Sequence, residues 1–238
     1  MPVTYANNHG IAYYGISGSG GSLPCAYDSA NVAGNIGMAW LTANEGAGPS
    51  GLTDTYSNVW YPFAGYFTNF GYSTIWVCPS LIGGANTVTV RGVIGGPSPS
   101  NAPVLSVMEY QPPSSGSVGF QALRGALGVN GIEGWDVYPP VLELDSVFSS
   151  SAVPYYSTLV AFLATTPSDS TNTVRTWSST ANLRFQYTDA GSKQTGAVAD
   201  ATSYNTPANS VVFSYSPTTP PLVGGYVSIV GILMNTTA

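Results

Sequence analysis

The amino-acid sequence predicts an all-β protein: an antiparallel β-sandwich of jelly-roll-like topology, preceded by an extended N-terminal arm. Three observations lead to this fold class. Short apolar or alternating segments recur roughly every ten residues, turn residues separate them, and no stretch keeps a helical period. Many short strands at this spacing are typical of sandwiches and barrels. Helix should therefore be scarce.

The first 35 residues show no sustained hydrophobic period. Glycine and serine dominate the stretch from Gly15 to Ser22, as in flexible segments. We therefore expect residues 1–35 to form an extended, Gly/Ser-rich arm, pinned either on its own domain or on a neighbouring subunit. Residues 36–238 should form the sandwich domain.

The clearest strands lie between Tyr72 and Tyr110. Three runs with strand character fill this segment: 73–78, 86–91 and 104–110. In the second run, Val88 and Val90 alternate with polar residues, so one face should meet a core and the other water. Glycine pairs such as Gly83-Gly84 lie between the runs, where the chain must reverse.

Further short strands are expected on both sides of this segment. The candidates are 36–42, 141–148, 156–163, 173–177, 183–187, 195–201, 210–215 and 225–234. The segment 111–140 has proline clusters near both ends, so it is either a long functional loop or an internal linker between two halves. The apolar run 222–234 is too short for a membrane helix and predicts a buried final strand.

The charge pattern argues against nucleic acid as a partner. Only 7% of the 238 residues are charged, the net charge is −6, and the five basic residues are scattered. No basic stripe is present to neutralise phosphates, so we expect no nucleic-acid binding. With 44% hydrophobic and 12% aromatic residues, the chain has enough apolar area to fold.

Residues that carry chemistry are sparse. His9 is the only histidine, and a Ser-His-Asp or Cys-His site would have to be built around it. The close carboxylate pairs, Glu133 with Asp136 and Glu143 with Asp145, fit solvated edges better than a glycosidase or calcium site. We therefore expect no catalytic residues, no cofactor and no metal.

Aromatic residues form the one candidate recognition surface. The stretch Tyr56–Phe70 is rich in rings, which either pack in the core or form an exposed contact surface. Five rings are the candidates for stacking on a glycan or touching a partner: Trp60, Tyr61, Tyr66, Tyr72 and Trp135. Exposed rings of this kind would suit an adhesin or carbohydrate-binding module.

Two cysteines, Cys25 and Cys78, are compatible with a disulfide or with two small buried hydrophobes. Residues 1–9 have neither the basic start nor the apolar stretch of a secretory signal. The composition nevertheless suits a protein that works outside cells. A chain made in a cytoplasm and released by lysis reconciles the two, and a processed secreted chain is the alternative.

Trp76, the run 83–90, the strand 104–110 and the strand 159–163 together resemble a recurrent pattern. It is similar to extracellular β-sandwich modules of phage head or tail appendages and of bacterial surface proteins. The resemblance implies a fold and a location outside the cell, and it supplies no catalytic residues.

On this basis we expect a non-enzymatic phage capsid decoration (cement) protein on the virion exterior. Its partners would be the major capsid protein and other copies of itself, most plausibly as a homotrimer, because decorating proteins sit on the symmetry axes of a lattice. The alternative is a receptor- or carbohydrate-binding adhesin on a tail fibre or a cell surface.

Overall fold

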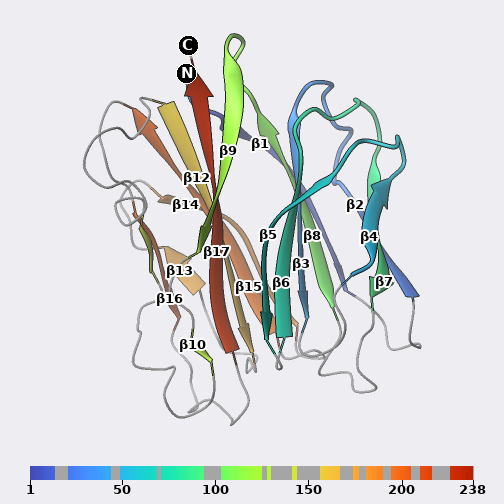
Figure 1. Cartoon of the computed structure of the whole chain (residues 1–238), viewed down its shortest axis with the longest axis vertical. Coiled ribbons are helices and arrows are strands. Elements are labelled where there is room, and N and C mark those ends of the chain that lie inside the picture. Colours follow the sequence, from blue (N-terminus) through green and yellow to red (C-terminus); the bar gives the residue numbers. More distant parts are fainter. Residues whose placement is uncertain are drawn as a thin grey trace. The chain divides into compact units, whose positions relative to one another are not determined.

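The structure, a computed structural model, is built from antiparallel β-sheets (Figure 1). It describes residues 1–13, 21–43, 49–68, 71–93, 103–124, 128–129, 141–143, 156–166, 174–176, 181–189, 194–204, 210–215 and 226–237. These residues contain no helix, which confirms the predicted all-β class. It follows that no helix in this part of the chain could span a membrane.

The chain divides into two compact units. The N-terminal unit is Tyr5–Pro112, and the C-terminal unit joins Met1–Thr4 to Pro113–Ala238. Thr158 Oγ1 donates to the carbonyl of Val3 at 2.6 Å, and Thr236 Oγ1 donates to that of Met1 at 3.0 Å. The first residues therefore belong to the same unit as the last strand, and the chain passes between the units twice.

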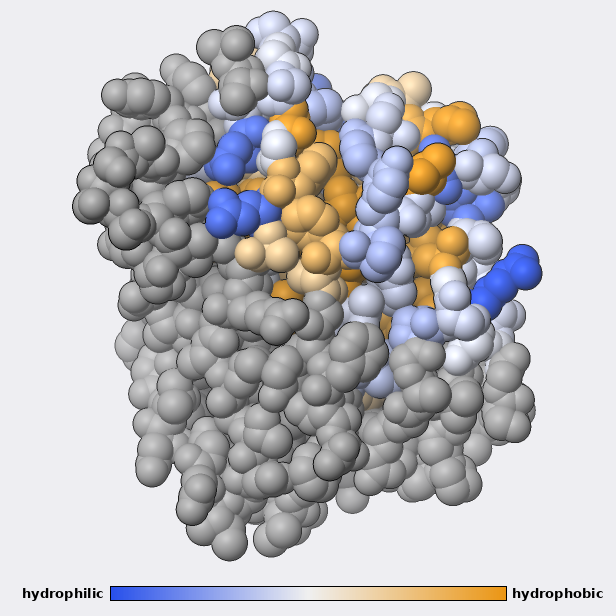
Figure 2. All heavy atoms as spheres, viewed as in Figure 1, coloured by the Kyte–Doolittle hydropathy of each residue, from blue (hydrophilic) through white to orange (hydrophobic). Residues whose placement is uncertain are grey.

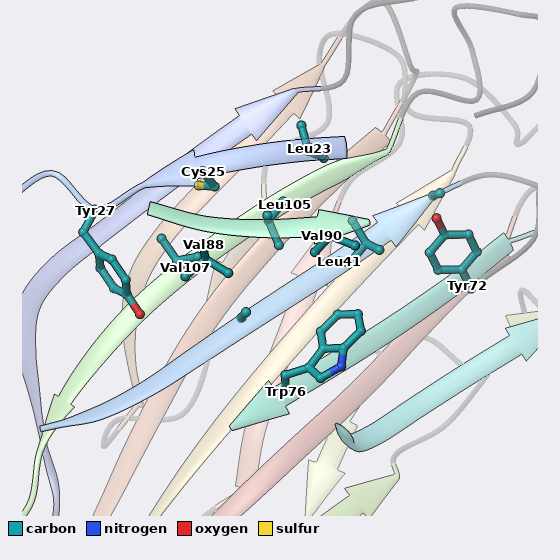
Figure 3. Close-up of a cluster of buried hydrophobic side chains, with 12 residues drawn as sticks. Leu23, Cys25, Tyr27, Leu41, Tyr72, Trp76, Val88, Val90, Leu105 and Val107 are labelled. Atoms are coloured by element: carbon teal, nitrogen blue, oxygen red, sulfur yellow. The ribbon is translucent and has the colours of Figure 1, made fainter. Parts of the chain in front are cut away.

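The N-terminal unit contains two sheets. The larger has the order β1 (Thr4–Tyr13), β8 (Val104–Gln111), β3 (Ile36–Ala43), β6 (Gly71–Cys78), β5 (Tyr61–Thr68). The smaller has the order β2 (Gly21–Ala26), β7 (Thr87–Val93), β4 (Gly51–Asp54). One apolar core draws residues from both sheets, including Leu41, Leu105, Val88 and Val90 (Figure 3). The unit is therefore sandwich-like.

The C-terminal unit repeats this arrangement. Its larger sheet has the order β10 (Gly128–Val129), β17 (Tyr226–Thr237), β12 (Tyr156–Thr166), β15 (Gln194–Tyr204), β14 (Ala181–Asp189), and β9 (Ser117–Arg124) also pairs with β17. Its smaller sheet has the order β11 (Val141–Glu143), β16 (Ser210–Tyr215), β13 (Val174–Thr176). When β9 and β10 are taken together as the first strand, both units contain eight strands in the same order.

The two units also share a bulge at the same place. In the hairpin of β5 and β6 the extra residue is Phe63, and in that of β14 and β15 it is Arg184. In both hairpins five residue pairs separate the bulge from the turn. A bulge inserts one unpaired residue and bends the strand, so its recurrence at one position is a specific likeness.

The two units are also alike in the residue pairing at the centre of their larger sheets. Beyond the bulge, Ile75 pairs with Trp40, and its equivalent Val198 pairs with Phe162. Both large rings are fully buried. Each ring stands between an alanine and a leucine, in Ala39-Trp40-Leu41 and Ala161-Phe162-Leu163. The two units are thus structural repeats, and this Ala–ring–Leu motif is a trace of the relationship in the sequence.

The strands predicted between Tyr72 and Tyr110 are confirmed as β6, β7 and β8. Val88 and Val90 of β7 are buried, while Thr87 and Thr89, which alternate with them, are partly exposed. However, these three strands are not neighbours, because β7 lies in the smaller sheet and β3 separates β6 from β8. Strand identity follows from local alternation, whereas strand pairing depends on contacts distant in sequence.

The extended arm expected over residues 1–35 is not confirmed. Within it, Thr4–Tyr13 and Gly21–Ala26 form β1 and β2, each paired in a sheet, and Tyr14–Gly20 lie outside the described residues. The glycines masked the strand pattern. At Gly10, for example, a Cβ would collide with the backbone carbonyl of Ala26, so close approach of the chains requires glycine there.

The segment expected to be a loop or linker, 111–140, contains β9 and β10. The change from one compact unit to the other falls at Pro112–Pro113, near its start. Residues 130–140 lie outside the described part of the chain.

Candidate functional site

The five aromatic residues expected at a recognition surface occupy different environments. Tyr72 is buried, with 1% of its surface exposed, and Trp60 is partly buried against the same core. Tyr61 is 54% exposed at the start of β5. The side chain of Tyr66 and all of Trp135 lie outside what the structure describes. Of these five candidates, Tyr61 is the one whose described side chain is exposed.

A buried carboxylate organises one end of the N-terminal unit. Glu109, on β8, is 1% exposed. Its Oε2 accepts hydrogen bonds from the side-chain amides of Asn8 at 2.5 Å and Asn31 at 2.8 Å. Its Oε1 accepts from the side chain of Asn35 at 2.6 Å and from the backbone N–H of Val32 at 2.8 Å. All four donors are neutral.

This arrangement holds the segment between β2 and β3 in place. The donors Asn31, Val32 and Asn35 all belong to this segment, which would otherwise be an ordinary surface loop. Asn8 adds two further bonds, donating to the carbonyl of Ser29 and accepting from its backbone N–H. Hydrogen bonds to a charged acceptor are stronger than neutral ones, so Glu109 acts as a fixed anchor for the loop.

Tyr27 lies beside this anchor without neutralising it. Its hydroxyl donates to the carbonyl of Met108 at 3.4 Å. Burial, together with the nearby charge of Glu109, raises the pKa of Tyr27 well above its ordinary value of 10.0. The phenol therefore stays protonated and serves as a donor.

A second carboxylate, Asp54, plays the same part at the end of β4. Its Oδ1 accepts from the backbone N–H groups of Tyr56 and Asn58. Its Oδ2 accepts from the side chains of Asn58 at 2.6 Å, Trp60 at 3.1 Å and Asn86 at 3.1 Å. Burial alone would raise the pKa of Asp54, but these bonds outweigh it and lower the pKa below 3.8.

Further hydrogen bonds join three segments into one structure, which we call the loop platform (residues 27–35, 54–61 and 80–86). Asn31 and Gly84 exchange backbone bonds, and the backbone N–H of Leu81 donates to Asn35. Asn58 Oδ1 accepts from the N–H of Ile82 at 2.8 Å. The platform is thus cross-linked both within and between its segments.

The loop platform displays apolar side chains outward. Val32 and Val59 are each 61% exposed, Ile82 is 51% exposed, and Tyr61 lies at its edge. Four asparagine side chains of the platform meanwhile donate to the two carboxylates, those of Asn31, Asn35, Asn58 and Asn86. Elsewhere, Figure 2 shows apolar and polar side chains mixed across the described part of one face, with few strongly hydrophilic groups.

His9 lies near the same end of the unit. Its Nδ1 is 3.0 Å from the hydroxyl of Tyr5, and its Nε2 is 3.7 Å from Oδ2 of Asp28. The backbone N–H of Asp28 also donates to the carbonyl of His9. The histidine thus links β1 to the first segment of the loop platform.

Little in the described residues resembles a metal or acid–base site. They contain no cluster of three or more histidine, cysteine or acidic side chains placed to hold a metal ion. Of the carboxylate pairs singled out in the sequence, Glu133, Asp136 and Asp145 lie outside the described residues, as does the side chain of Glu143.

Both cysteines are buried free thiols in the N-terminal unit. Burial raises the pKa of Cys25 to about 12 and also raises that of Cys78. Thiolates are the reactive form of cysteine, so neither group is suited to act as a nucleophile at neutral pH.

Comparison of this chain with family models, curated protein sequences and solved structures finds no match. The site is therefore interpreted from its own geometry. Glu109 and its asparagines were not predicted as a group from the sequence. One signal was present: Glu109 is the only acid in the mostly apolar run Val104–Tyr110, and a buried strand seldom carries a carboxylate without partners.

Proposed function

We propose that this chain is a non-enzymatic structural protein of a virus particle, exposed on its exterior and bound to the capsid lattice. The observation that supports the proposal is the strand order, which occurs twice in one chain. More specifically, we propose that the protein is a phage decoration (cement) protein.

The strand order supports a jelly-roll topology for each unit. In the N-terminal unit β1 pairs with β8, and β3 with β6, in one sheet, while β2 pairs with β7 in the other. The first strand thus pairs with the eighth, the second with the seventh and the third with the sixth. This is the pairing of one long hairpin that is folded over into two sheets. In the C-terminal unit β9 pairs with β17, β11 with β16 and β12 with β15. We infer that both units are jelly rolls, each with its fifth strand moved onto the larger sheet.

Jelly rolls are the building blocks of many viral capsids and also of lectins. Two jelly rolls in one chain favour a capsid protein over a lectin, because a lattice repeats similar units around symmetry axes. A homotrimer of this chain would present six similar units around one axis. Such an assembly could follow a sixfold arrangement of major capsid proteins, and multivalent attachment would strengthen weak individual contacts.

The surface chemistry supports the same proposal. A chain with 7% charged residues forms few ion pairs, so contacts with its neighbours would come from apolar and backbone groups. Contacts of that kind are little affected by the ionic strength outside the host. The partners we propose are the major capsid protein and further copies of this chain.

The test is to purify virions and delete the gene for this chain. A decoration protein should be present in many copies per particle, and particles should still assemble without it but lose their contents at a lower temperature. Failure to form any shell would indicate a shell-forming protein instead. Absence of the chain from virions would refute the proposal.

A carbohydrate-binding adhesin is the second candidate, since lectins also use jelly rolls and Tyr61 presents an exposed ring. A glycan array with the purified chain tests it. Binding that is lost in Tyr61→Ala would favour the adhesin, whereas an array without hits would exclude it.

A further inference from the structure

We propose that the loop platform of the N-terminal unit is the surface through which the chain binds a second copy of itself. This inference rests on the proposed function, because it assigns the self-association of a lattice protein to a defined surface. Four observations carry it: the exposed apolar residues, the internal bracing, a comparison between the two units, and the near absence of charge.

The apolar side chains on the loop platform are unusual for loops. Exposed connections are normally polar, yet Val32, Val59, Tyr61 and Ile82 are each at least half exposed. The other large apolar side chains that are exposed in the described residues are Met1, Tyr13 and Leu183. The platform thus carries more of them than the rest of the described chain.

The loop platform is rigid before any partner arrives. Glu109 and Asp54 together accept nine hydrogen bonds from its backbone and side chains and from Asn8. Ordering loops and side chains opposes association, so a surface that is already ordered binds more tightly for the same contact area. The bracing makes the apolar residues effective anchors.

The equivalent strand position of the C-terminal unit shows that the larger sheet does not need a carboxylate there. Counted from Trp40 and Phe162, the position of Glu109 corresponds to that of Leu233, which is also fully buried. An apolar residue therefore completes the same sheet without a carboxylate. The acid in the N-terminal unit supports the loops above it, which indicates that their conformation matters for more than folding.

The charge of the loop platform indicates which partner it fits. Its residues include no lysine or arginine, and its two acids are Asp28 and Asp54. Asp54 is bound internally, and Asp28, whose side chain is 66% exposed, lies 3.7 Å from Nε2 of His9. A partner with many charges would lose hydration here and find a single exposed acid as counter-charge. A surface of equally low charge fits better, and this chain, with 7% charged residues, supplies one.

One edge of the larger sheet is a poorer route to association. The sheet ends in β1 on one side and in β5 on the other, and β5 carries the bulge at Phe63; bulges at sheet edges hinder pairing with another chain. Association through side chains of the loop platform needs no strand pairing, so the bulge does not hinder it.

The experiment measures the mass of the full-length chain by sedimentation equilibrium over a range of concentrations. The wild type should form an oligomer of 24.6 kDa protomers. The variants Val59→Asp and Ile82→Asp should each raise the dissociation constant at least about tenfold. Tyr13→Asp and Leu183→Asp, exposed apolar residues outside the platform, are matched controls and should leave the constant unchanged.

Urea denaturation of each variant separates lost association from lost folding, because the substituted side chains are exposed. As a second measurement, Val59→Cys should be cross-linked between chains by a short bismaleimide, and Tyr13→Cys should not. If the wild type oligomerises and the platform variants oligomerise equally well, the inference is refuted while the proposed function stands. A wild type that stays monomeric at every concentration would also refute the inference, and the virion test would still decide the proposed function.

Discussion

Glu109 and Leu233 occupy the same position in the two units of this chain. Each lies on the eighth strand, three residues beyond the partner of a large buried ring, Trp40 in one unit and Phe162 in the other. One position of the repeated fold therefore holds a hydrogen-bonded carboxylate in the first unit and a core leucine in the second. The sheet therefore accepts an apolar residue at this position, and the carboxylate of Glu109 serves the loops of the N-terminal unit.

Replacing Glu109 by glutamine should destabilise the N-terminal unit by about 3 kcal/mol. The new amide would turn an N–H donor toward the donors of Asn35 and Val32 or of Asn8 and Asn31, and the charge that strengthens the bonds would be gone. Urea denaturation measures the effect. The control Asp28→Asn, at an exposed acid, should change stability by about 0.5 kcal/mol or less. Equal stability of Glu109→Gln and wild type would contradict the anchoring role.

Asp54 should make a pH-dependent contribution to stability. Its folded pKa lies below 3.8, so its charged form is favoured in the folded state. The stabilisation is therefore fully present above the unfolded pKa and is lost as the pH falls through the folded value. Asp54→Asn should be less stable than wild type at pH 7, and the difference should shrink in acid. A difference that is constant with pH would refute this assignment.

Gly84→Ala should destabilise the protein more than Gly34→Ala. Both glycines have positive φ, of 124° and 86°, where alanine is strained by about 1 kcal/mol. A Cβ at Gly34 would meet nothing within 4 Å, whereas one at Gly84 would collide with the Tyr56 ring. Thermal denaturation of the two variants compares strain alone with strain plus collision. Equal losses would indicate that the ring moves aside freely.

Arg184→Met should destabilise the C-terminal unit by about 3 to 5 kcal/mol. Arg184 holds Asp200 through two hydrogen bonds of 2.7 Å, and Asp200 is 1% exposed. Removing the guanidinium leaves a buried carboxylate without its counter-charge. The double variant Arg184→Met/Asp200→Leu should recover most of the loss, as measured by urea denaturation. A double variant less stable than the single one would show that the pair itself stabilises the sheet.

The two thiols should react slowly with a disulfide reagent such as DTNB in the native protein and rapidly in denaturant. Burial raises the pKa of Cys25 to about 12, so almost none of it is thiolate at pH 8. Two equivalents should be released on unfolding, because both cysteines are free. The variants Cys25→Ser and Cys78→Ser should each release one. Release of none from the unfolded wild type would indicate a disulfide.

The sequence was sufficient for the fold class and for individual strands such as β7, where Val88 and Val90 alternate with polar residues. It was insufficient for the first 26 residues, where glycines such as Gly10 concealed β1 and β2. The five candidate rings show the same limit, because ring-rich stretches look alike whether buried, as Tyr72 is, or exposed, as Tyr61 is.

The sequence by itself determined the all-β class, several strands such as β3, β6, β7 and β8, and that few charges would reach the surface, because these properties depend on neighbouring residues or on composition. The tertiary structure alone decided the strand order, the repetition of the two units and the assembly of the loop platform. Glu109 and its donors Asn8, Asn31 and Asn35 are 74 to 101 residues apart in the chain. Only the pairing of β8 with β1 and β3 brings them together, since local patterns carry no record of distant contacts.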